Sequence, residues 1–133
     1  MAVHLTLRTP IGAAGSIANN INGTAIDVIG VPSILTMFGN GEIVGMSHTL
    51  NMFVGGRAST PIPTSALPLA STPGAIKKDE DFIARIPVPA GARIVHNITN
   101  PGAASNVDFL YILETAQEAG RLAGQGVLGT DLA

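Results

Sequence analysis

Three histidines are the residues of this 133-residue chain best suited to acid–base or metal chemistry. His48 and His96 each occupy an apolar position of an alternating pattern, which predicts that both side chains point into a core. His4 lies in the polar positions of another alternating run. A histidine at an apolar position is more often a core residue hydrogen-bonded to its neighbours than a metal ligand or a general base. The pattern therefore favours structural roles for His48 and His96, with metal or acid–base chemistry as the alternative.

The carboxylates available for catalysis are Asp27, Glu42 and Asp108, and nothing in the surrounding sequence marks them. Glycoside hydrolysis uses two carboxylates that are distant in the chain, so a single sequence leaves that reaction open. The Gly-x-Ser-x-Gly elbow of serine hydrolases is absent. The segment Gly12-Ala13-Ala14-Gly15 lacks the lysine of a phosphate-binding loop and the spacing of a dinucleotide fingerprint. We interpret the three acids as surface or turn residues and predict a protein without enzymatic activity, with no catalytic, cofactor-binding or metal-binding residue.

Composition argues against several classes of ligand. Aromatic residues make up 4% of the chain and tryptophan is absent, whereas sugar sites and single-stranded nucleic-acid sites rely on aromatic stacking. The formal net charge is −2, so no positive field attracts nucleic acid. The absence of cysteine excludes disulfides and thiolate metal sites. We expect no signal peptide at residues 1–6 and no membrane span, since no apolar run approaches about 18 residues.

One short segment resembles the cupins, a family of metal-binding β-barrels. Pro89-Ala90-Gly91 followed by His96 and Asn100 is similar to the second half-motif of that family, a Pro-x-Gly turn followed by His and then Asn. The spacing departs, because four residues separate Gly91 from His96 where the family has two. The first half-motif, His-x-His followed by Glu, is absent. A cupin-like metal enzyme using His48 and His96 is therefore the weakest of the functional hypotheses.

The elements that would carry these residues are β-strands, and the strongest signal is a run of three between Asp81 and Leu113. Apolar and polar residues alternate along residues 82–88, 92–99 and 107–113. Pro89-Ala90-Gly91 and Asn100-Pro101-Gly102 separate them as turns. A period of two between Gly, Pro and Asn clusters is typical of half-buried antiparallel strands.

Earlier in the chain the pattern predicts a first strand from Val3 to Pro10, a small-residue loop at residues 12–23 and a strand from Thr24 to Val31. Apolar runs at residues 33–38 and 42–54 flank Asn40-Gly41, and Asn-Gly between apolar runs is the strongest short hairpin signal. The sequence therefore predicts a two-residue hairpin in which Met37 pairs with Val44. In that register Leu35 would pair with Met46.

Two segments differ in composition from the predicted strands. Residues 59–76 are rich in Pro, Ser, Thr and Ala, and since proline removes ladder donors this segment cannot form a central strand. It is predicted to be an extended arm or a long surface loop. Residues 114–133 are predicted to form a tail, with a short helix over Glu114–Ala123 that carries acid early and Arg121 late. The contact regions expected from these features are Ser59–Pro73 and Ala116–Ala133.

The composition suits association between subunits. Hydrophobic residues make up 46% of the chain and charged residues only 12%, against a usual charged share of about 25%. Few like-charge repulsions then oppose contact between copies. The sequence therefore predicts a single β-domain, residues 1–133, that forms a homo-oligomer.

The whole pattern resembles small single jelly-roll proteins of virus particles, in particular minor capsid and decoration proteins of bacteriophages. The features that carry this resemblance are the strand-turn-strand run Phe82–Val95, the Pro-rich arm and the Gly/Ala-rich termini. The resemblance implies an all-β antiparallel sandwich of jelly-roll type that assembles with copies of itself or with other capsid proteins. It also implies a location in the virion after synthesis in the host cytoplasm. The alternative is a carbohydrate- or receptor-binding jelly roll with Tyr111 or a phenylalanine on a concave face.

Overall fold

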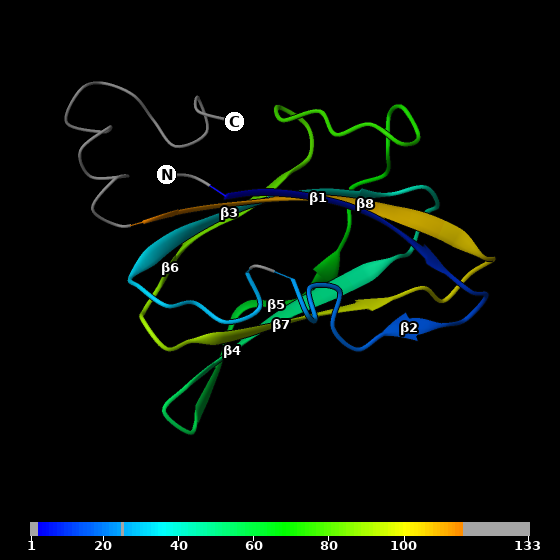
Figure 1. Ribbon diagram of the computed structural model, residues 1–133. Coiled ribbons are helices and arrows are strands. Elements are labelled where there is room, and N and C mark those ends of the chain that lie inside the picture. Colours follow the sequence, from blue (N-terminus) through cyan, green and yellow to red (C-terminus); the bar gives the residue numbers. More distant parts are fainter. Residues whose placement is uncertain (1–2, 25, 116–133) are drawn as a thin grey trace.

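Alternating apolar residues produce two antiparallel sheets of four strands each, packed face to face as a β-sandwich (Figure 1). The structure is a computed structural model and describes residues 3–24 and 26–115. The strands are β1 (Val3–Ile11), β2 (Ser16–Ile17), β3 (Ser33–Gly41), β4 (Ser47–Val54), β5 (Arg57–Ala66), β6 (Phe82–Val88), β7 (Arg93–Thr99) and β8 (Ser105–Thr115). The predicted all-β sandwich is confirmed to this extent.

The strand order follows a simple rule. One sheet, called sheet A here, has the order β1-β8-β3-β6, and sheet B has the order β2-β7-β4-β5. The first strand pairs with the last, the second with the seventh, the third with the sixth and the fourth with the fifth. The pairs β3–β8 and β4–β7 then join these couples within each sheet. The chain therefore behaves as one long hairpin folded over itself.

The core lies between the two sheets and is built by side-chain alternation. In β7 the buried residues are Ile94, His96 and Ile98, and the residues between them are exposed or half-buried. In β8 the core-facing residues Val107, Phe109 and Tyr111 are fully buried. Burying an aliphatic or phenylalanine side chain stabilises the fold by roughly 1.5–3 kcal/mol. The predicted strands are therefore stabilised mainly by contacts across the sandwich.

The three consecutive strands predicted between Asp81 and Leu113 are present as β6, β7 and β8. They do not pair with one another in sequence, because β6 and β8 lie in sheet A whereas β7 lies in sheet B. The turn at residues 89–92 carries the chain from one sheet to the other. Gly91 has a φ of +81° there, a conformation that glycine adopts at little cost.

The predicted Asn40-Gly41 hairpin is wrong. Strand β3 continues through both residues to pair with β8, and β4 belongs to the other sheet. A type I′ turn needs positive φ at both central residues, whereas neither residue has it. Asn40 is instead buried, and its amide donates to the carbonyl of Ala75 and to the Asp81 carboxylate. Of the residues in the two predicted pairs, Leu35, Met37 and Met46 are buried in the core, whereas Val44 is 79% exposed.

The strand predicted for Thr24–Val31 is also wrong. Among its described residues, only Val28 makes a bridge, to Arg93. Local hydrogen bonds take over, since the Thr24 hydroxyl donates to the Ile21 carbonyl and the Asp27 amide donates to the Thr24 carbonyl. Ile26 and Ile29 are buried by this looped course. Both of those apolar side chains therefore reach the core without a strand.

The segment predicted as an arm begins inside an edge strand. Residues 57–66 form β5 at the edge of sheet B, and residues 67–81 connect it to β6. The register with β4 is interrupted twice, between His48 and Leu50 and between Leu50 and Met52, and Pro61 and Pro63 lie in these two interruptions. The argument that proline keeps this segment from the centre of a sheet agrees with the edge position. The prediction of a loop was wrong for residues 59–66.

Strand β8 extends two residues beyond the predicted end, through Glu114 and Thr115. The predicted helix therefore cannot begin at Glu114, and the remainder of the predicted tail lies outside the described residues. Within the described part of the chain, no helix has the length and apolar character needed to cross a membrane.

Candidate functional site

The polar centre of the core is a chain of hydrogen bonds through His48, His96 and Tyr111. Nδ1 of His48 lies 2.9 Å from Nε2 of His96, and Nδ1 of His96 lies 2.7 Å from the Tyr111 hydroxyl. The Asn20 amide donates to that hydroxyl at 2.8 Å, and the Thr9 hydroxyl donates to the Asn20 side-chain oxygen at 2.8 Å. The chain thus links β4, β7, β8 and β1 across the sandwich.

The backbone of the loop at residues 19–21 fixes His96 in this arrangement. The Asn19 side-chain oxygen accepts hydrogen bonds from the amides of His96 and Ile21. The backbone amide of Asn20 donates to the His96 carbonyl at 2.8 Å. The ring of Phe109 meets the His96 ring edge to face, with 4.6 Å between centroids. His96 is therefore held by backbone, amide and aromatic contacts together.

One assignment of protons satisfies every bond in the chain. Because Asn20 donates to the Tyr111 oxygen, the phenolic proton is free to be donated to Nδ1 of His96. His96 then carries its proton on Nε2 and donates it to Nδ1 of His48. In this assignment a second proton on either ring would set two donors against each other and break one of these bonds. The reversed assignment, in which Nδ1 of His48 donates to His96 and Nδ1 of His96 donates to the Tyr111 oxygen, satisfies the same bonds.

The electrostatics of the interior act in the same direction. Burial lowers the pKa of His48 to about 4. Burial, and then the charge of neighbouring His48, lowers the pKa of His96 to about 3. Burial raises the pKa of Tyr111 above its ordinary value, against a smaller lowering effect of the Asn20 hydrogen bond. The phenol therefore stays protonated, and both imidazoles stay neutral at neutral pH.

The predicted core roles of His48 and His96 are confirmed, since both are buried and hydrogen-bonded to neighbours. Their facing nitrogens are engaged with each other. Among residues 3–24 and 26–115, no group of three or more His, Cys, Asp or Glu is placed to hold a metal ion. The cupin-like ligand set proposed around these two histidines therefore does not assemble in the described residues.

Removing the Tyr111 hydroxyl should be costly because it is hydrogen-bonded to two buried groups. In Tyr111→Phe, Nδ1 of His96 loses its partner and the Asn20 amide loses its acceptor, both in a buried place. An unsatisfied buried polar group costs about 1–3 kcal/mol, so we expect a loss of roughly 2–4 kcal/mol in the free energy of unfolding. Urea unfolding at neutral pH measures it. Tyr111→Phe combined with Asn20→Leu should recover part of the loss, and strict additivity of the two would contradict the proposed chain.

Tyr111 was also predicted as a residue of a concave sugar-binding face, and the structure contradicts this. Its ring is fully buried and stacks on Phe109 at a centroid separation of 5.8 Å. A stacking platform for a sugar must be exposed. Tyr111 therefore cannot serve a carbohydrate ligand in this fold.

The three acids singled out from the sequence are divided between two places. Glu42 and Asp108 both pair with Arg8, whose Nη1 atom lies 2.9 Å from one Asp108 oxygen. Arg8 donates hydrogen bonds to Glu42 and to Asp108. These bonds, that to Glu42 first, raise the pKa of the exposed Arg8 guanidinium above its usual value. Asp27 lies elsewhere, 3.8 Å from the Nε atom of Arg93. All three acids form ion pairs with arginines. Asp108 is buried within β8, so its interpretation as a surface or turn residue was wrong.

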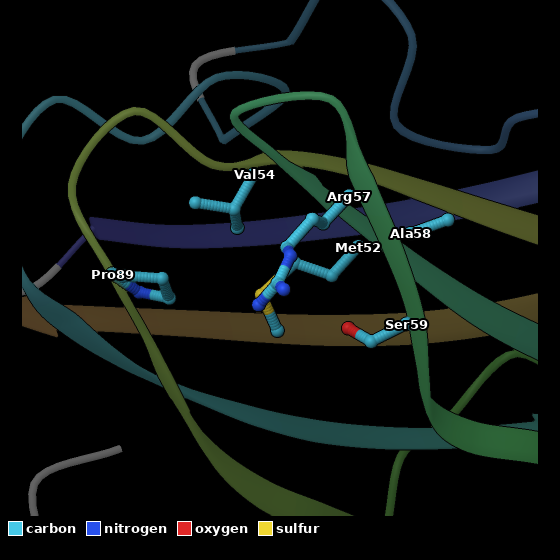
Figure 2. A pocket seen from close by; sticks show the side chains of 6 residues that line it. All are labelled: Met52, Val54, Arg57, Ala58, Ser59 and Pro89. Atoms are coloured by element: carbon cyan, nitrogen blue, oxygen red, sulfur yellow. The ribbon is translucent and has the colours of Figure 1, made fainter.

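A surface hollow lies at the tip of the β4–β5 hairpin (Figure 2). We call it the hairpin hollow; it has a volume of about 640 Å³ and is lined by Met52, Val54, Arg57, Ala58, Ser59 and Pro89. Figure 2 shows the Arg57 side chain extending into the middle of these residues. Among the described residues Arg57 has no carboxylate partner. The hollow is therefore apolar with one unpaired cation.

A second hollow, which we call the valine hollow, lies where β1 begins and β8 ends. It has a volume of about 220 Å³ and is lined by Val3, Val28, Ile29, Gly30, Val31, Ser33, Leu113 and Thr115. Val28 is 60% exposed and Val31 is 51% exposed. The amides of Ile29 and Gly91 bond to the carbonyls of Ala92 and Ile29, respectively. These bonds place Ile29 of the valine hollow next to the turn at residues 89–92. Pro89 of the same turn lines the hairpin hollow, so the two hollows lie at the same end of the sandwich.

Sequence reasoning missed both hollows. Their linings come from segments far apart in the chain, such as Val3, Val31 and Leu113, which no local pattern connects. The one available signal was the pair of valines at residues 28 and 31 beside Gly30 and Pro32, which had been assigned to a strand.

Comparison with known proteins gives little similarity. No family model matches the chain, and no curated protein matches it. Among solved structures, the chain is similar to one described as "Bacillus endospore appendages form a novel family of disulfide-linked pili". The match has 15% sequence identity and a TM-score of 0.38, and it covers 86% of this chain and 88% of that one. This chain has no cysteine and hence no means of forming a disulfide. At this level the likeness assigns neither a fold family nor a function.

Proposed function

We propose that the protein is a non-enzymatic structural subunit that acts by associating with copies of itself. The observation that carries the proposal is the exposure of Val3, Val28 and Val31 around the valine hollow, at the end of the sandwich that also holds the hairpin hollow. Apolar surface that gathers in one place, rather than being scattered, is typical of an interaction site. A chain with only 12% charged residues adds little repulsion to such contacts.

We further propose that the sandwich is a jelly roll and that the assembly is a virus particle, in which the protein is a capsid, minor capsid or decoration protein. The pairing of first strand with last, second with seventh, third with sixth and fourth with fifth supports the jelly roll. Double-sheet jelly rolls of eight strands occur in viral capsid proteins as well as in lectins and cupins. The buried Tyr111 and the paired histidines favour the first of these three.

Association is tested by size-exclusion chromatography with light scattering, from low to high protein concentration. We expect the mean mass to rise with concentration above that of one chain. A mass that stays at one chain up to the solubility limit, in the presence and absence of salt, would overturn the proposal.

The virion assignment needs its own test. Immunogold labelling of purified source material, viewed by electron microscopy, should place the protein on regular particles. Labelling confined to material without such particles would refute the virion while leaving self-association intact.

A further inference from the structure

We propose that copies of this protein associate head to tail, with the end that bears the two hollows receiving the opposite end of a second copy. This inference rests on the proposed function, since it names the surfaces through which the copies would meet. The first surface, called the valine end, consists of the valine hollow and the hairpin hollow. The second, called the loop end, consists of the loops at residues 42–46 and 67–70.

The loop end presents apolar side chains that protrude. Val44 is 79% exposed, the largest fraction among the exposed apolar residues of the described chain, and Leu69 is 53% exposed. The two loops are tied together, because the Leu67 amide donates to the Met46 carbonyl and Leu69 bridges to Gly41. Val44 sits just before Gly45, whose φ of +96° turns the loop back. The loop end thus carries two exposed apolar side chains on loops that are held together by backbone contacts.

Shape favours a second copy as the occupant of the valine end. A hollow of about 220 Å³ edged by Val3, Val28 and Val31 matches an aliphatic side chain such as that of Val44 or Leu69. Filling it would remove apolar surface from water on both copies at once. Packed apolar cores at interfaces between copies are the usual source of their stability.

Charge determines which ends should meet. The described charged residues near the valine end are three cations, Arg57, Arg85 and Arg93, and two carboxylates, Asp27 and Glu114. Those near the loop end and the adjoining loop are three cations and five carboxylates: Arg8, Lys77 and Lys78 with Glu42, Asp79, Glu80, Asp81 and Asp108. One end is therefore net positive and the other net negative. Two like ends would repel, whereas unlike ends attract.

A head-to-tail contact uses two different surfaces, so each copy keeps one free surface of each kind. Such heterologous contacts generate a closed ring or an open filament, whereas like-to-like contacts stop at a dimer. This difference allows the orientation to be tested with two variants that each damage one end.

The test uses Val28→Asp/Val31→Asp at the valine end and Val44→Arg at the loop end. These side chains are more than half exposed, so the substitutions should leave the fold unchanged, as circular dichroism and urea unfolding verify. Each adds a charge that repels the surface it would meet, and we expect each variant alone to lose association by on the order of a hundred-fold in dissociation constant. Thr64→Asp, on the exposed polar face of sheet B, is the matched control and should associate as the wild type does.

Mixing the two variants gives the decisive measurement. The intact loop end of one variant can still dock on the intact valine end of the other, so light scattering should show complexes that contain both variants, although each variant alone stays monomeric. The two altered ends carry opposite added charges and can also attract each other. A wild-type protein that associates while both variants also associate normally would overturn the head-to-tail inference alone. Loss of association by the valine-end variant but not by Val44→Arg would overturn it in favour of a like-to-like dimer, and so would the lack of a mixed complex. A wild-type protein that stays monomeric would overturn both this inference and the proposed function.

Discussion

Lowering the pH from 7.5 to 5 is expected to weaken the fold through His48 and His96. Their pKa values in the folded state, about 4 and about 3, lie below the ordinary value of about 6.5 that applies to the unfolded chain. Between pH about 6.5 and about 4 the unfolded chain therefore binds more protons than the folded one. The free energy of unfolding should then fall as the pH falls through this range, by up to roughly 2 kcal/mol per imidazole at pH 5.

The hydrogen-bond partners of the two rings explain why no compensation is available. They are neutral groups, the Tyr111 hydroxyl and the two imidazoles themselves, joined to the Asn20 amide. The carboxylates of β8, Asp108 and Glu114, alternate with Phe109 and Tyr111 and so point away from the core. No described carboxylate contacts the rings to stabilise an added proton.

Urea unfolding at a series of pH values measures this effect. His96→Gln should be less stable than the wild type at pH 7.5, because a buried bond is lost, but its stability should depend less on pH between 6.5 and 5. His4→Gln is the control, since His4 is exposed on β1, and it should reproduce the wild-type profile. An unchanged slope in both His96→Gln and His48→Gln would contradict the assignment of the acid sensitivity to this pair.

A methyl group at Gly39 is expected to destabilise the protein severely. A Cβ atom at this position of β3 would lie 2.4 Å from two ring atoms of Phe109 and 3.1 Å from the Cδ1 atom of Ile83. Phe109 is fully buried between His96 and Tyr111, so its ring has no room to shift. Overpacking of a core usually costs 1–3 kcal/mol, and we expect Gly39→Ala to cost about 3 kcal/mol or more, because the ring also orients the His96 imidazole.

Two other glycines provide graded controls for this substitution. A Cβ at Gly41 would meet Met46 Sδ at 2.6 Å, and a flexible thioether can move aside more easily than a ring. Gly30 has no atom within 4 Å of the added group, so Gly30→Ala should stay within about 0.5 kcal/mol of the wild type. Thermal or urea unfolding should therefore show the largest loss of stability for Gly39→Ala, a smaller loss for Gly41→Ala and no clear loss for Gly30→Ala. Equal losses for Gly39→Ala and Gly30→Ala would contradict the tight contact with Phe109.

The strands predicted correctly from the sequence are those in which apolar and polar residues alternate because one face is buried. Residues 93–99 show this clearly, because every second side chain enters the core. The Asn40-Gly41 signal failed because the same residues serve packing and hydrogen bonding: Gly39 and Gly41 leave room for Phe109 and Met46, and the Asn40 amide binds the loop at residues 75–81. Turn propensity is a local preference, and contacts with distant segments overrode it.

The candidate site was likewise predicted only in part from the sequence. The burial of His48 and His96 followed from their positions in the strand pattern. Their contact with each other did not, since they lie 48 residues apart on different strands. The exposed ends of the sandwich could not be predicted either, because residues from opposite halves of the chain form them.

The edge strand β5 has a consequence for the protein in concentrated solution. Pro61 and Pro63 offer no amide hydrogen, and the two register interruptions bend the ribbon where a foreign strand would have to lie flat. Two copies that meet side by side at β5 therefore cannot form a continuous ladder of backbone hydrogen bonds. Crowding should therefore not join copies through β5 into insoluble cross-β material.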